Sequence, residues 1–211
     1  MTKEKNYNVI RTKIFEWFDK NKNNYPWRNT KDLFQILISE ILLQKTIASN
    51  VANLYEVFFK KYKCFLDIIQ TDIAELQSDI KSLGLSNKRA QILRDLSELV
   101  LDKYNGKIPE DSEKLREVKG ISDYVSNAYL CFGLNKKTYF QDVNIKRFIS
   151  RIFAQEVKNP IIKEILTKIL PDSDYKCFYW GLLDFGSKIC TKKKPKCEIC
   201  PLNCLCNYYK S

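Results

Sequence analysis

The sequence has no histidine among its 211 residues. This absence excludes serine–histidine and cysteine–histidine catalysis, histidine general bases and histidine-ligated zinc. Any acid or base chemistry must therefore come from carboxylates, tyrosine or lysine.

Long hydrophobic runs are also missing. No stretch of about 18 apolar residues could span a bilayer. The N-terminal stretch MTKEKNYNVIRTKIFEWFDK places Ile10, Ile14, Trp17 and Phe18 at helical spacing, without the continuous apolar core of a signal peptide. We therefore expect an intracellular, cytoplasmic protein with no membrane partner.

Alternating strands and internal repeats are absent as well. Apolar residues recur every three or four positions almost throughout, which is helical spacing. The pattern predicts an all-α protein of roughly nine or ten helices. With 211 residues and 45% hydrophobic content, the chain can bury a core as one domain or two small lobes.

The charge is strongly positive and is spread along the chain. Lysine and arginine number 36 against 25 acidic residues, which leaves a net charge of +11. Such a surface suits a polyanion, and nucleic acid is the leading candidate. The alternative is a solvated basic surface with no partner.

One predicted helix carries a carboxylate among apolar residues. In LFQILISEILLQK, residues 33 to 45, Glu40 lies in the middle and Gln44 one turn later on the same face. Burial without a partner would raise the pKa of Glu40, as a general acid requires. The alternative is an interhelical salt bridge or a partly exposed glutamate.

A helical hairpin is predicted in DSEKLREVKGISDYVSNAYLCFG, residues 111 to 133. A first helix is capped near Ser112, a tight turn follows at Lys119-Gly120-Ile121, and Ser122 caps a second helix. Gly120 allows close backbone approach, and the start of the second helix offers N–H groups to an anion. On a basic protein this hairpin is a candidate phosphate clamp, although many all-α proteins contain a glycine-turned helix pair.

Cysteine usage separates into two groups. Cys64, Cys131 and Cys177 are each isolated among apolar residues, so we expect them in the core. The C-terminal segment has the spacing Cys-x6-Cys-x2-Cys-x5-Cys, which is too compact for a two-pair zinc ribbon and suits one 4Fe-4S cluster. Zinc is the alternative metal. The four expected ligands are Cys190, Cys197, Cys200 and Cys206. Cys204 could exchange with Cys206, but the x5 spacing favours Cys206.

Several motifs in order resemble the helix-hairpin-helix DNA glycosylases of the endonuclease III and MutY superfamily. The resemblance covers about residues 20 to 209. Its motifs are YPWR at 25 to 28, SEILLQKT at 39 to 46, KGISDYVSNA at 119 to 128, QDVNIKR at 141 to 147 and LLDFGSKIC at 182 to 190. The resemblance implies a two-lobed all-α fold with a six-helix barrel at 29–134 and a 4Fe-4S lobe formed by 1–28 plus 135–211.

The resemblance also implies roles for individual residues. Asp142 matches the essential aspartate, which would stabilise positive charge on the sugar and orient water. Glu40 matches a glutamate of the base pocket, and Gln44 a glutamine that fills the space left by an extruded base. The wider set expected to contact DNA is Arg28, Gln44, Lys45, Lys119, Gly120, Ser122 and Lys146.

Position 124 distinguishes branches of the superfamily. The bifunctional endonuclease III type has lysine there, MutY has serine, and the archaeal-type mismatch-specific thymine glycosylases have tyrosine. Tyr124 cannot form a Schiff base, so the resemblance implies a monofunctional, hydrolytic glycosylase. The function expected is base excision repair of thymine or uracil opposite guanine.

Three other functions are alternatives to this one. They are adenine removal in the MutY manner, a bifunctional glycosylase and lyase, and a catalytically silent DNA-structure binder. The chain departs from the family's LPGVG hairpin at Lys119 and Ser122, and Lys119 places an amine near the site. The expected partner is double-stranded DNA with a mismatched or damaged base, bound by a monomer. A monovalent cation in the hairpin turn is a further expectation, as is association with the nucleoid.

Overall fold

The computed structural model describes residues 3–153 and 159–210, and these residues form helices and no strand. The all-α prediction is confirmed. Twelve α-helices occur in the described ranges instead of nine or ten, because α4, α5, α7 and α12 are short elements that the apolar pattern does not resolve. None of the described helices is both long and apolar enough for a membrane crossing.

The chain divides into two compact units, residues 1–23 with 139–211 and residues 24–138. The first unit contains α1 (Lys3–Asn21), α9 (Val143–Phe153), α10 (Asn159–Ile169), α11 (Tyr175–Lys188), η4 (Asn203–Leu205) and α12 (Asn207–Lys210). The second contains η1 (Pro26–Arg28), α2 (Leu33–Leu42), α3 (Ala48–Lys61), α4 (Phe65–Gln70), α5 (Ile73–Asp79), η2 (Lys81–Leu83), α6 (Ser86–Glu98), η3 (Leu99–Lys103), α7 (Ser112–Leu115) and α8 (Asp123–Leu134).

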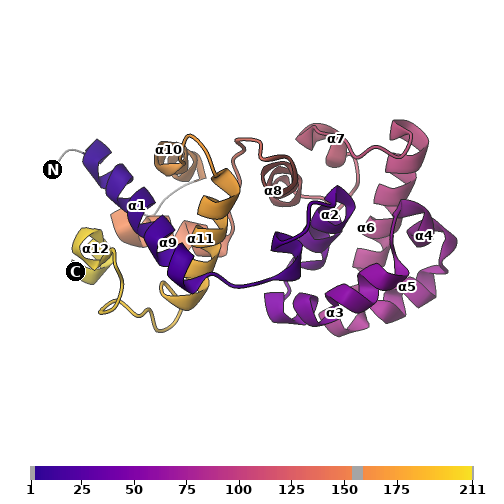
Figure 1. Ribbon diagram of the computed structural model, residues 1–211, viewed down its shortest axis with the longest axis horizontal. Coiled ribbons are helices and arrows are strands. Elements are labelled where there is room, and N and C mark those ends of the chain that lie inside the picture. Colours follow the sequence, from indigo (N-terminus) through magenta and orange to yellow (C-terminus); the bar gives the residue numbers. More distant parts are fainter. Residues whose placement is uncertain (1–2, 154–158, 211) are drawn as a thin grey trace. The chain divides into compact units, whose positions relative to one another are not determined.

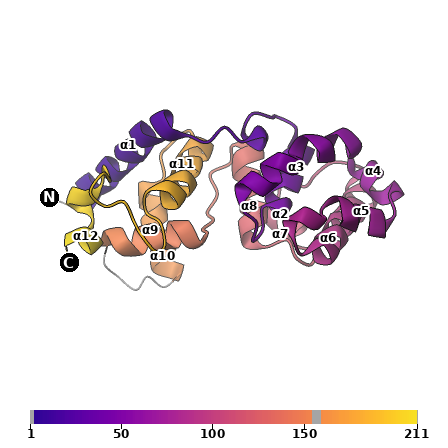
Figure 2. The same ribbon diagram turned by 90° about the horizontal axis from the view of Figure 1, so that it is seen from below.

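In the first unit, α1 lies against α11 (Figures 1 and 2). Ile10 and Ile14 of α1 are fully buried. A Cβ atom at Gly181 of α11 would lie 2.9 Å from the Ile14 side chain, so glycine at this position lets the two helices approach closely. Arg11 donates to the carbonyl oxygens of Ile169 and Leu170 and so anchors α1 to the end of α10.

In the second unit, α2 is the central helix and packs most extensively against α8 (Figure 1). Asp32 caps α2 by accepting a hydrogen bond from the Phe34 N–H at 2.9 Å. From Ile36 to Leu42 every residue of α2 is buried. Because the whole circumference is covered over this stretch, a polar side chain there is also removed from water.

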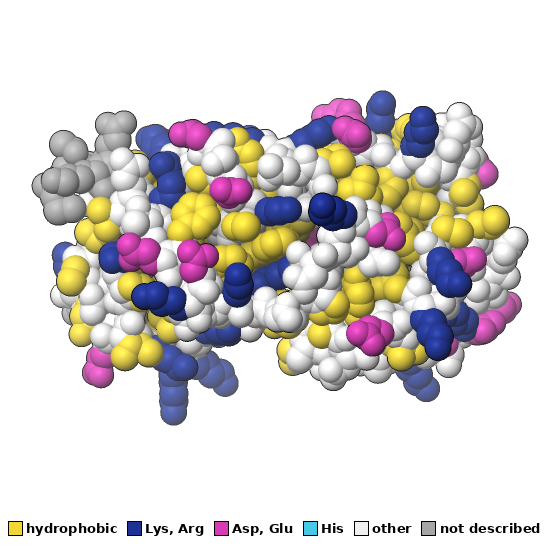
Figure 3. All heavy atoms as spheres, viewed as in Figure 1, with side chains coloured by type: hydrophobic (Ala, Val, Ile, Leu, Met, Phe, Trp, Pro, Cys, Tyr) yellow, Lys and Arg dark blue, Asp and Glu magenta, His cyan; other side chains and the backbone are white. Residues whose placement is uncertain are grey.

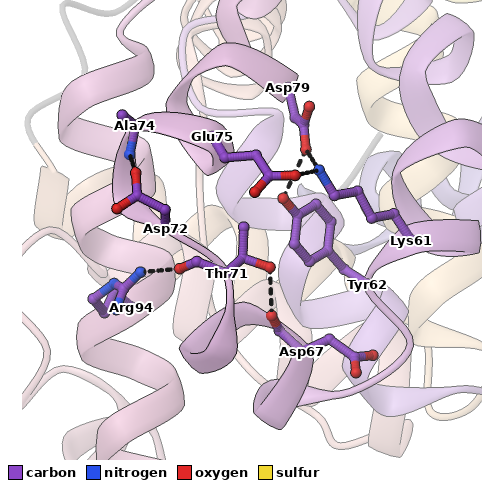
Figure 4. Close-up of polar contacts among 9 residues, drawn as sticks. All are labelled: Lys61, Tyr62, Asp67, Thr71, Asp72, Ala74, Glu75, Asp79 and Arg94. Atoms are coloured by element: carbon purple, nitrogen blue, oxygen red, sulfur yellow. Dashed lines mark hydrogen bonds and ion pairs between the residues drawn. The ribbon is translucent and has the colours of Figure 1, made fainter.

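Figure 4 shows a polar cluster that joins the end of α3 to α5. Lys61 pairs with Glu75 at 2.6 Å and with Asp79 at 2.5 Å. The Tyr62 hydroxyl donates to the same Asp79 carboxylate at 2.7 Å. Pairs this exposed contribute little to stability. Lys61 nevertheless has its charge neutralised within the protein, which makes it a poor candidate for a contact to an outside anion.

Two local predictions were wrong. The helix expected over residues 33 to 45 ends at Leu42, and Gln44 lies in the following turn instead of on the helix face with Glu40. Cys64 is exposed; it is the N-cap of α4, where its N–H donates to the Asp67 carboxylate. Cys131 is buried as expected, and Cys177 is half-buried.

Candidate functional site

Asp142 lies at the N-terminus of α9 and is held by three hydrogen bonds. Its Oδ1 accepts from the N–H groups of Asn144 at 2.9 Å and Ile145 at 2.8 Å. Its Oδ2 accepts from Asn144 Nδ2 at 2.7 Å. Burial raises the pKa of Asp142, while these hydrogen bonds and the charge of Arg147 oppose the rise. The carboxylate is therefore held in one orientation and partly shielded from water.

Glu40 lies on the buried stretch of α2 and is only 3% exposed. Its Oε2 atom is buried and accepts no hydrogen bond from the described residues. Burial raises the pKa of Glu40 to about 8, against the opposing charge of Arg28. Glu40 is thus not the partly exposed or salt-bridged residue of the alternative interpretation, and its carboxyl group can hold a proton at neutral pH.

Arg28 is positioned by the aromatic residues of its own motif. Its guanidinium lies 5.1 Å from the centroid of the Tyr25 ring, and Tyr25 stacks on Trp27 with the ring centroids 4.7 Å apart. Trp27 is buried, and η1 packs against α2. This arrangement fixes a cation beside the helix that carries Glu40.

The helical hairpin is formed by α7, a turn and α8. Asp111 caps α7, one residue before the expected Ser112. Gly120 has φ +110°, and a Cβ atom there would lie 2.5 Å from Ile92 Cδ1, so both the backbone conformation and the packing require glycine. Ser122 caps α8 by accepting from the Val125 N–H at 3.4 Å, as the sequence predicts. Tyr124 follows in the first turn of α8 and is half-buried.

The turn after α2 is attached to two other segments. Gln44 Nε2 donates to the carbonyl oxygen of Gly120 at 3.1 Å, which links the turn to the hairpin. Buried Arg89 donates to the carbonyl oxygens of both Gln44 and Gly84. Leu85, directly after Gly84, has φ +54° and an exposed apolar side chain. The Arg89 guanidinium therefore connects the turn that contains Gln44 to Gly84, the residue before Leu85.

Leu85 is a candidate functional residue that the sequence analysis missed. A leucine in the left-handed region is uncommon, and this one is 54% exposed. The signal available in the sequence was the position after Gly84 at a predicted helix break. The connection of Leu85 to Gln44 is seen only in the structure, where Arg89 binds the carbonyl oxygens of Gly84 and Gln44.

Four of the C-terminal cysteines are among the residues that line a small pocket in the first unit. The four predicted ligand cysteines contribute to its wall, together with residues of α9, α11 and α12. They are Cys190, Cys197, Cys200 and Cys206. Cys204 is exposed and is not part of the pocket wall; its thiol donates to Asn203 Oδ1 at 3.2 Å. Within the described ranges, no three cysteine or acidic side chains meet as ligands of a single metal ion.

The basic residues expected to contact DNA differ in exposure. Lys45 and Lys119 are exposed, whereas Lys146 and Arg28 are half-buried. On the face shown in Figure 3, lysine and arginine side chains are scattered among hydrophobic ones. The distribution agrees with the spread of charge along the sequence.

Residues 38–172 match the HhH-GPD superfamily of base excision DNA repair proteins. The chain belongs to this superfamily. The family resemblance drawn from the motifs is therefore confirmed. The candidate residues of this HhH-GPD protein occur in both units: Glu40, Gln44 and Tyr124 lie in residues 24–138, and Asp142 lies in the unit that also contains the cysteine pocket.

Relatives of this HhH-GPD chain include two archaeal proteins that it matches over nearly their full length. The thymine/uracil-DNA glycosylase of Methanothermobacter thermautotrophicus is 37% identical over 96% of this chain and 94% of the relative. The thymine-DNA glycosylase of Aeropyrum pernix is 34% identical over 96% and 95%. A solved structure of a thermostable thymine-DNA glycosylase superposes with a TM-score of 0.92 at 36% identity, covering 98% of this chain and 97% of that one.

Proposed function

We propose that this protein is a monofunctional DNA glycosylase that excises thymine or uracil opposite guanine and leaves an abasic site. The observation that carries the proposal is the similarity to the thymine and thymine/uracil glycosylases over nearly the whole of both chains. Tyr124 supports the monofunctional reaction, because a phenol cannot form the Schiff base that leads to strand cleavage. The protein would act as a monomer on double-stranded DNA at the nucleoid.

Asp142 is the residue we assign to the sugar. Breaking the glycosidic bond develops positive charge on the sugar, and a fixed carboxylate stabilises that charge without reorganisation. The same carboxylate can orient the attacking water. Its hydrogen bonds to Asn144 and Ile145 favour the ionised form that both tasks require.

Glu40 is the residue we assign to the leaving base. With a pKa near 8, its carboxyl group is mostly protonated at neutral pH and can donate a hydrogen bond or a proton to an oxygen of the extruded base. The Oε2 atom, which lacks a partner among the described residues, suits such a contact. Arg28 would keep this pKa within reach of neutral pH.

The hairpin and the turn after α2 are assigned to the duplex. The active site cannot reach a base that is stacked inside the DNA duplex, so the base must be flipped out. Mispaired bases are the easiest to extrude. Leu85 is exposed, and Gln44 is held at the hairpin by its hydrogen bond to Gly120; we assign both side chains to the space that the base vacates. Gly120, Ser122 and Lys119 would contact a backbone phosphate, and the turn carbonyls could hold a monovalent cation.

A 4Fe-4S cluster is the cofactor that fits the cysteine pocket. Four cysteines are among the residues that line one pocket, whose other lining residues are largely apolar, while the Cys204 thiol donates to Asn203. Base excision involves no redox step, so the cluster would serve to shape the basic segment Lys192 to Lys196 for phosphate contacts. Metal analysis of anaerobically purified protein should give about four irons per chain with broad absorbance near 400 nm; stoichiometric zinc without iron would refute this assignment.

One set of duplexes tests the function. Labelled strands carrying T·G, U·G, A·G, A·8-oxoguanine and thymine glycol are incubated with the protein and analysed with and without alkali. We expect excision from T·G and U·G only, with strand breaks appearing after alkali. Excision of adenine would favour the MutY reaction, and binding without excision of any base would favour the silent binder.

The monofunctional assignment is tested at the same time by borohydride trapping. The parent should form no covalent complex, whereas Tyr124→Lys, which places an amine at this position, should nick and trap. If the parent already traps DNA, Lys119 or another lysine acts as nucleophile and the enzyme is bifunctional.

A further inference from the structure

Two exposed residues of the second unit have a backbone conformation that suits neither of them. Lys45 and Leu85 both have φ +54°, in the left-handed region. Within the described ranges, the other non-glycine residues with a positive φ are all asparagine or aspartate, namely Asn105, Asn135 and Asp174. Asparagine and aspartate tolerate this conformation, whereas other side chains adopt it only at a conformational cost. Lys45 and Leu85 therefore bear a strain that the other three residues do not.

One guanidinium binds the peptide group that precedes each strained residue. Arg89 donates to the carbonyl oxygen of Gln44, which comes directly before Lys45. It also donates to the carbonyl oxygen of Gly84, which comes directly before Leu85. Because the peptide group is planar and φ is the rotation that follows it, holding this plane restrains φ of the next residue. Arg89 therefore restrains two strained residues from separate segments in the same way.

Two further contacts strengthen this attachment. Arg89 Nη2 donates to Thr46 Oγ1 at 2.5 Å, and Nη1 donates to the carbonyl oxygen of Leu83 at 3.1 Å. Thr46 Oγ1 also lies 3.3 Å from that carbonyl oxygen. Arg89 is 2% exposed, so water does not readily replace the guanidinium. Without Arg89, the carbonyl oxygens of both segments would lose this donor, and the present backbone path would be disfavoured.

The side chains at positions 45 and 85 are retained although the strain could be avoided. Glycine would take the same conformation without a steric cost. Lys45 is exposed and Leu85 is 54% exposed, so neither is held by core packing. A cation suits a backbone phosphate, and an exposed apolar side chain suits insertion between bases. A contact made outside the protein therefore explains why this strain is kept.

We propose that Arg89 is a positioning residue that fixes Lys45 and Leu85 in the left-handed conformation and thereby sets where both side chains meet the DNA. The inference rests on the proposed function, in which these segments contact the duplex. Leu85 would insert beside the extruded base, and Lys45 would contact a phosphate. Arg89 is buried and would touch neither.

A purely structural role for Arg89 is the competing explanation. The carbonyl oxygens that it binds lie at the ends of α2 and η2, where a cation stabilises a helix C-terminus. Arg94, further along α6, supplies the matched control. It donates to the carbonyl oxygens of Ile69 and Thr71, and Figure 4 shows the second contact. None of its hydrogen bonds within the described ranges reaches residues 44–46 or 83–85.

The experiment compares Arg89→Met, Arg89→Lys and Arg94→Met with the parent. One duplex carries a tetrahydrofuran abasic site opposite guanine with 2-aminopurine as the neighbouring base, and a second duplex is fully matched. Neither contains thymine or uracil opposite guanine. The 2-aminopurine emission at saturating protein reports unstacking beside the site. The ratio of the affinities for the abasic and matched duplexes reports how much insertion contributes to binding, and thermal stability is recorded for each variant.

We expect the parent to prefer the abasic duplex and to raise the emission. Arg89→Met should lose most of the rise, and its affinity ratio should fall on the order of tenfold. Arg89→Lys should lose less, because the charge remains although an ammonium cannot reproduce the planar fork of the guanidinium. Arg94→Met should keep the ratio and the emission even if its stability falls as much as that of Arg89→Met.

A double-mutant cycle separates positioning from general stability. Both Arg89 substitutions are also made in a Lys45→Gly/Leu85→Gly background, where the two side chains are gone. There they should cause no further fall in the affinity ratio. The same fall in both backgrounds would overturn the proposal, as would a parental ratio in Arg89→Met or an equal loss in Arg94→Met.

The design also distinguishes this inference from the proposed function. If the parent excises neither thymine nor uracil, the substrate assignment fails, while the abasic duplex still tests the role of Arg89. If Arg89→Met does not fold, Arg89→Lys in the two backgrounds decides the question. A parent that neither prefers the abasic duplex nor raises the emission would refute insertion and the role of Arg89 with it.

Discussion

Glu40 and Asp142 carry the same functional group but are prepared for opposite tasks by their surroundings. Glu40 lies in the middle of a helix buried on all sides, and its Oε2 receives no hydrogen bond from the described residues. Asp142 lies at a helix N-terminus, where three donors hold its two oxygens. Burial raises both pKa values; hydrogen bonds oppose the rise at Asp142, whereas at Glu40 only the charge of Arg28 opposes it. The buried centre of α2 thus favours the protonated form of Glu40, whereas the donors at the N-terminus of α9 favour the ionised form of Asp142.

Among the substitutions that test this comparison, Asp142→Asn should have the largest effect on excision. Asparagine caps a helix as well as aspartate does, so the fold should persist while the charge is lost. We expect excision from a U·G duplex to fall by about 10³-fold with duplex affinity largely retained. Single-turnover kinetics and a binding titration measure the two quantities.

Asp142→Ala provides the control for the cap. It should show the same kinetic loss and a further loss of stability of about 1 kcal/mol, measured by chemical denaturation. Unchanged excision by Asp142→Asn would remove Asp142 from the mechanism.

Glu40→Gln should have the second largest effect. The amide cannot supply a proton to the leaving base, so we expect excision to slow by about 10²-fold. In the parent, the rate should decline as pH rises through about 8, because Glu40 then loses its proton. In Glu40→Gln this alkaline limb should disappear. A limb of unchanged position in the variant would show that another group titrates there.

The same substitution makes a prediction about stability. Between pH 5 and 8 the unfolded chain has released the Glu40 proton while the folded protein still holds it, so unfolding releases a proton and stability falls as pH rises. The free energy of unfolding of the parent, relative to Glu40→Gln, should fall by about 1.4 kcal/mol per pH unit in this window. Denaturant titrations at pH 5, 6.5 and 8 provide the measurement. A difference that stays constant with pH would contradict the raised pKa.

The smallest effect is expected from Arg28→Met. Its guanidinium lowers the pKa of Glu40, so removing it should move the alkaline limb of the rate profile to higher pH by a fraction of a unit. Arg28→Lys should leave the limb nearer to its parental position. If Arg28→Met instead weakens binding to matched and mismatched duplexes alike, without moving the limb, Arg28 acts on DNA and not on Glu40.

The sequence could predict those parts of the site whose structure is determined by residues nearby in the chain. The apolar pattern around Glu40 indicated a buried carboxylate but left a salt-bridged or partly exposed glutamate as the alternative, which the burial of Glu40 decides. The Gly120 and Ser122 pattern was sufficient to predict the turn and the cap. The helix end at Leu42 was not predictable, since the apolar pattern continues beyond it.

Longer-range contacts explain the other differences. The residues around Leu85 do not indicate its connection to Gln44, because Arg89 joins Gly84 to a carbonyl 45 residues away in the chain. Cys64 was expected in the core from its apolar neighbours, yet its place at the start of α4 leaves it exposed. The spacing of the four cysteines made them candidate ligands, whereas the pocket that they all line depends on the fold of the first unit.

The Arg89 contacts also have a consequence for the thermodynamics of DNA binding. Loops that become ordered only in a complex lose conformational entropy at that moment, and affinity falls accordingly. Here the turn with Gln44 and the segment with Leu85 are already immobilised when the protein folds, through one side chain that is 2% exposed. The conformational entropy of both segments is therefore lost when the protein folds. Their insertion into a duplex then requires a smaller further loss of entropy.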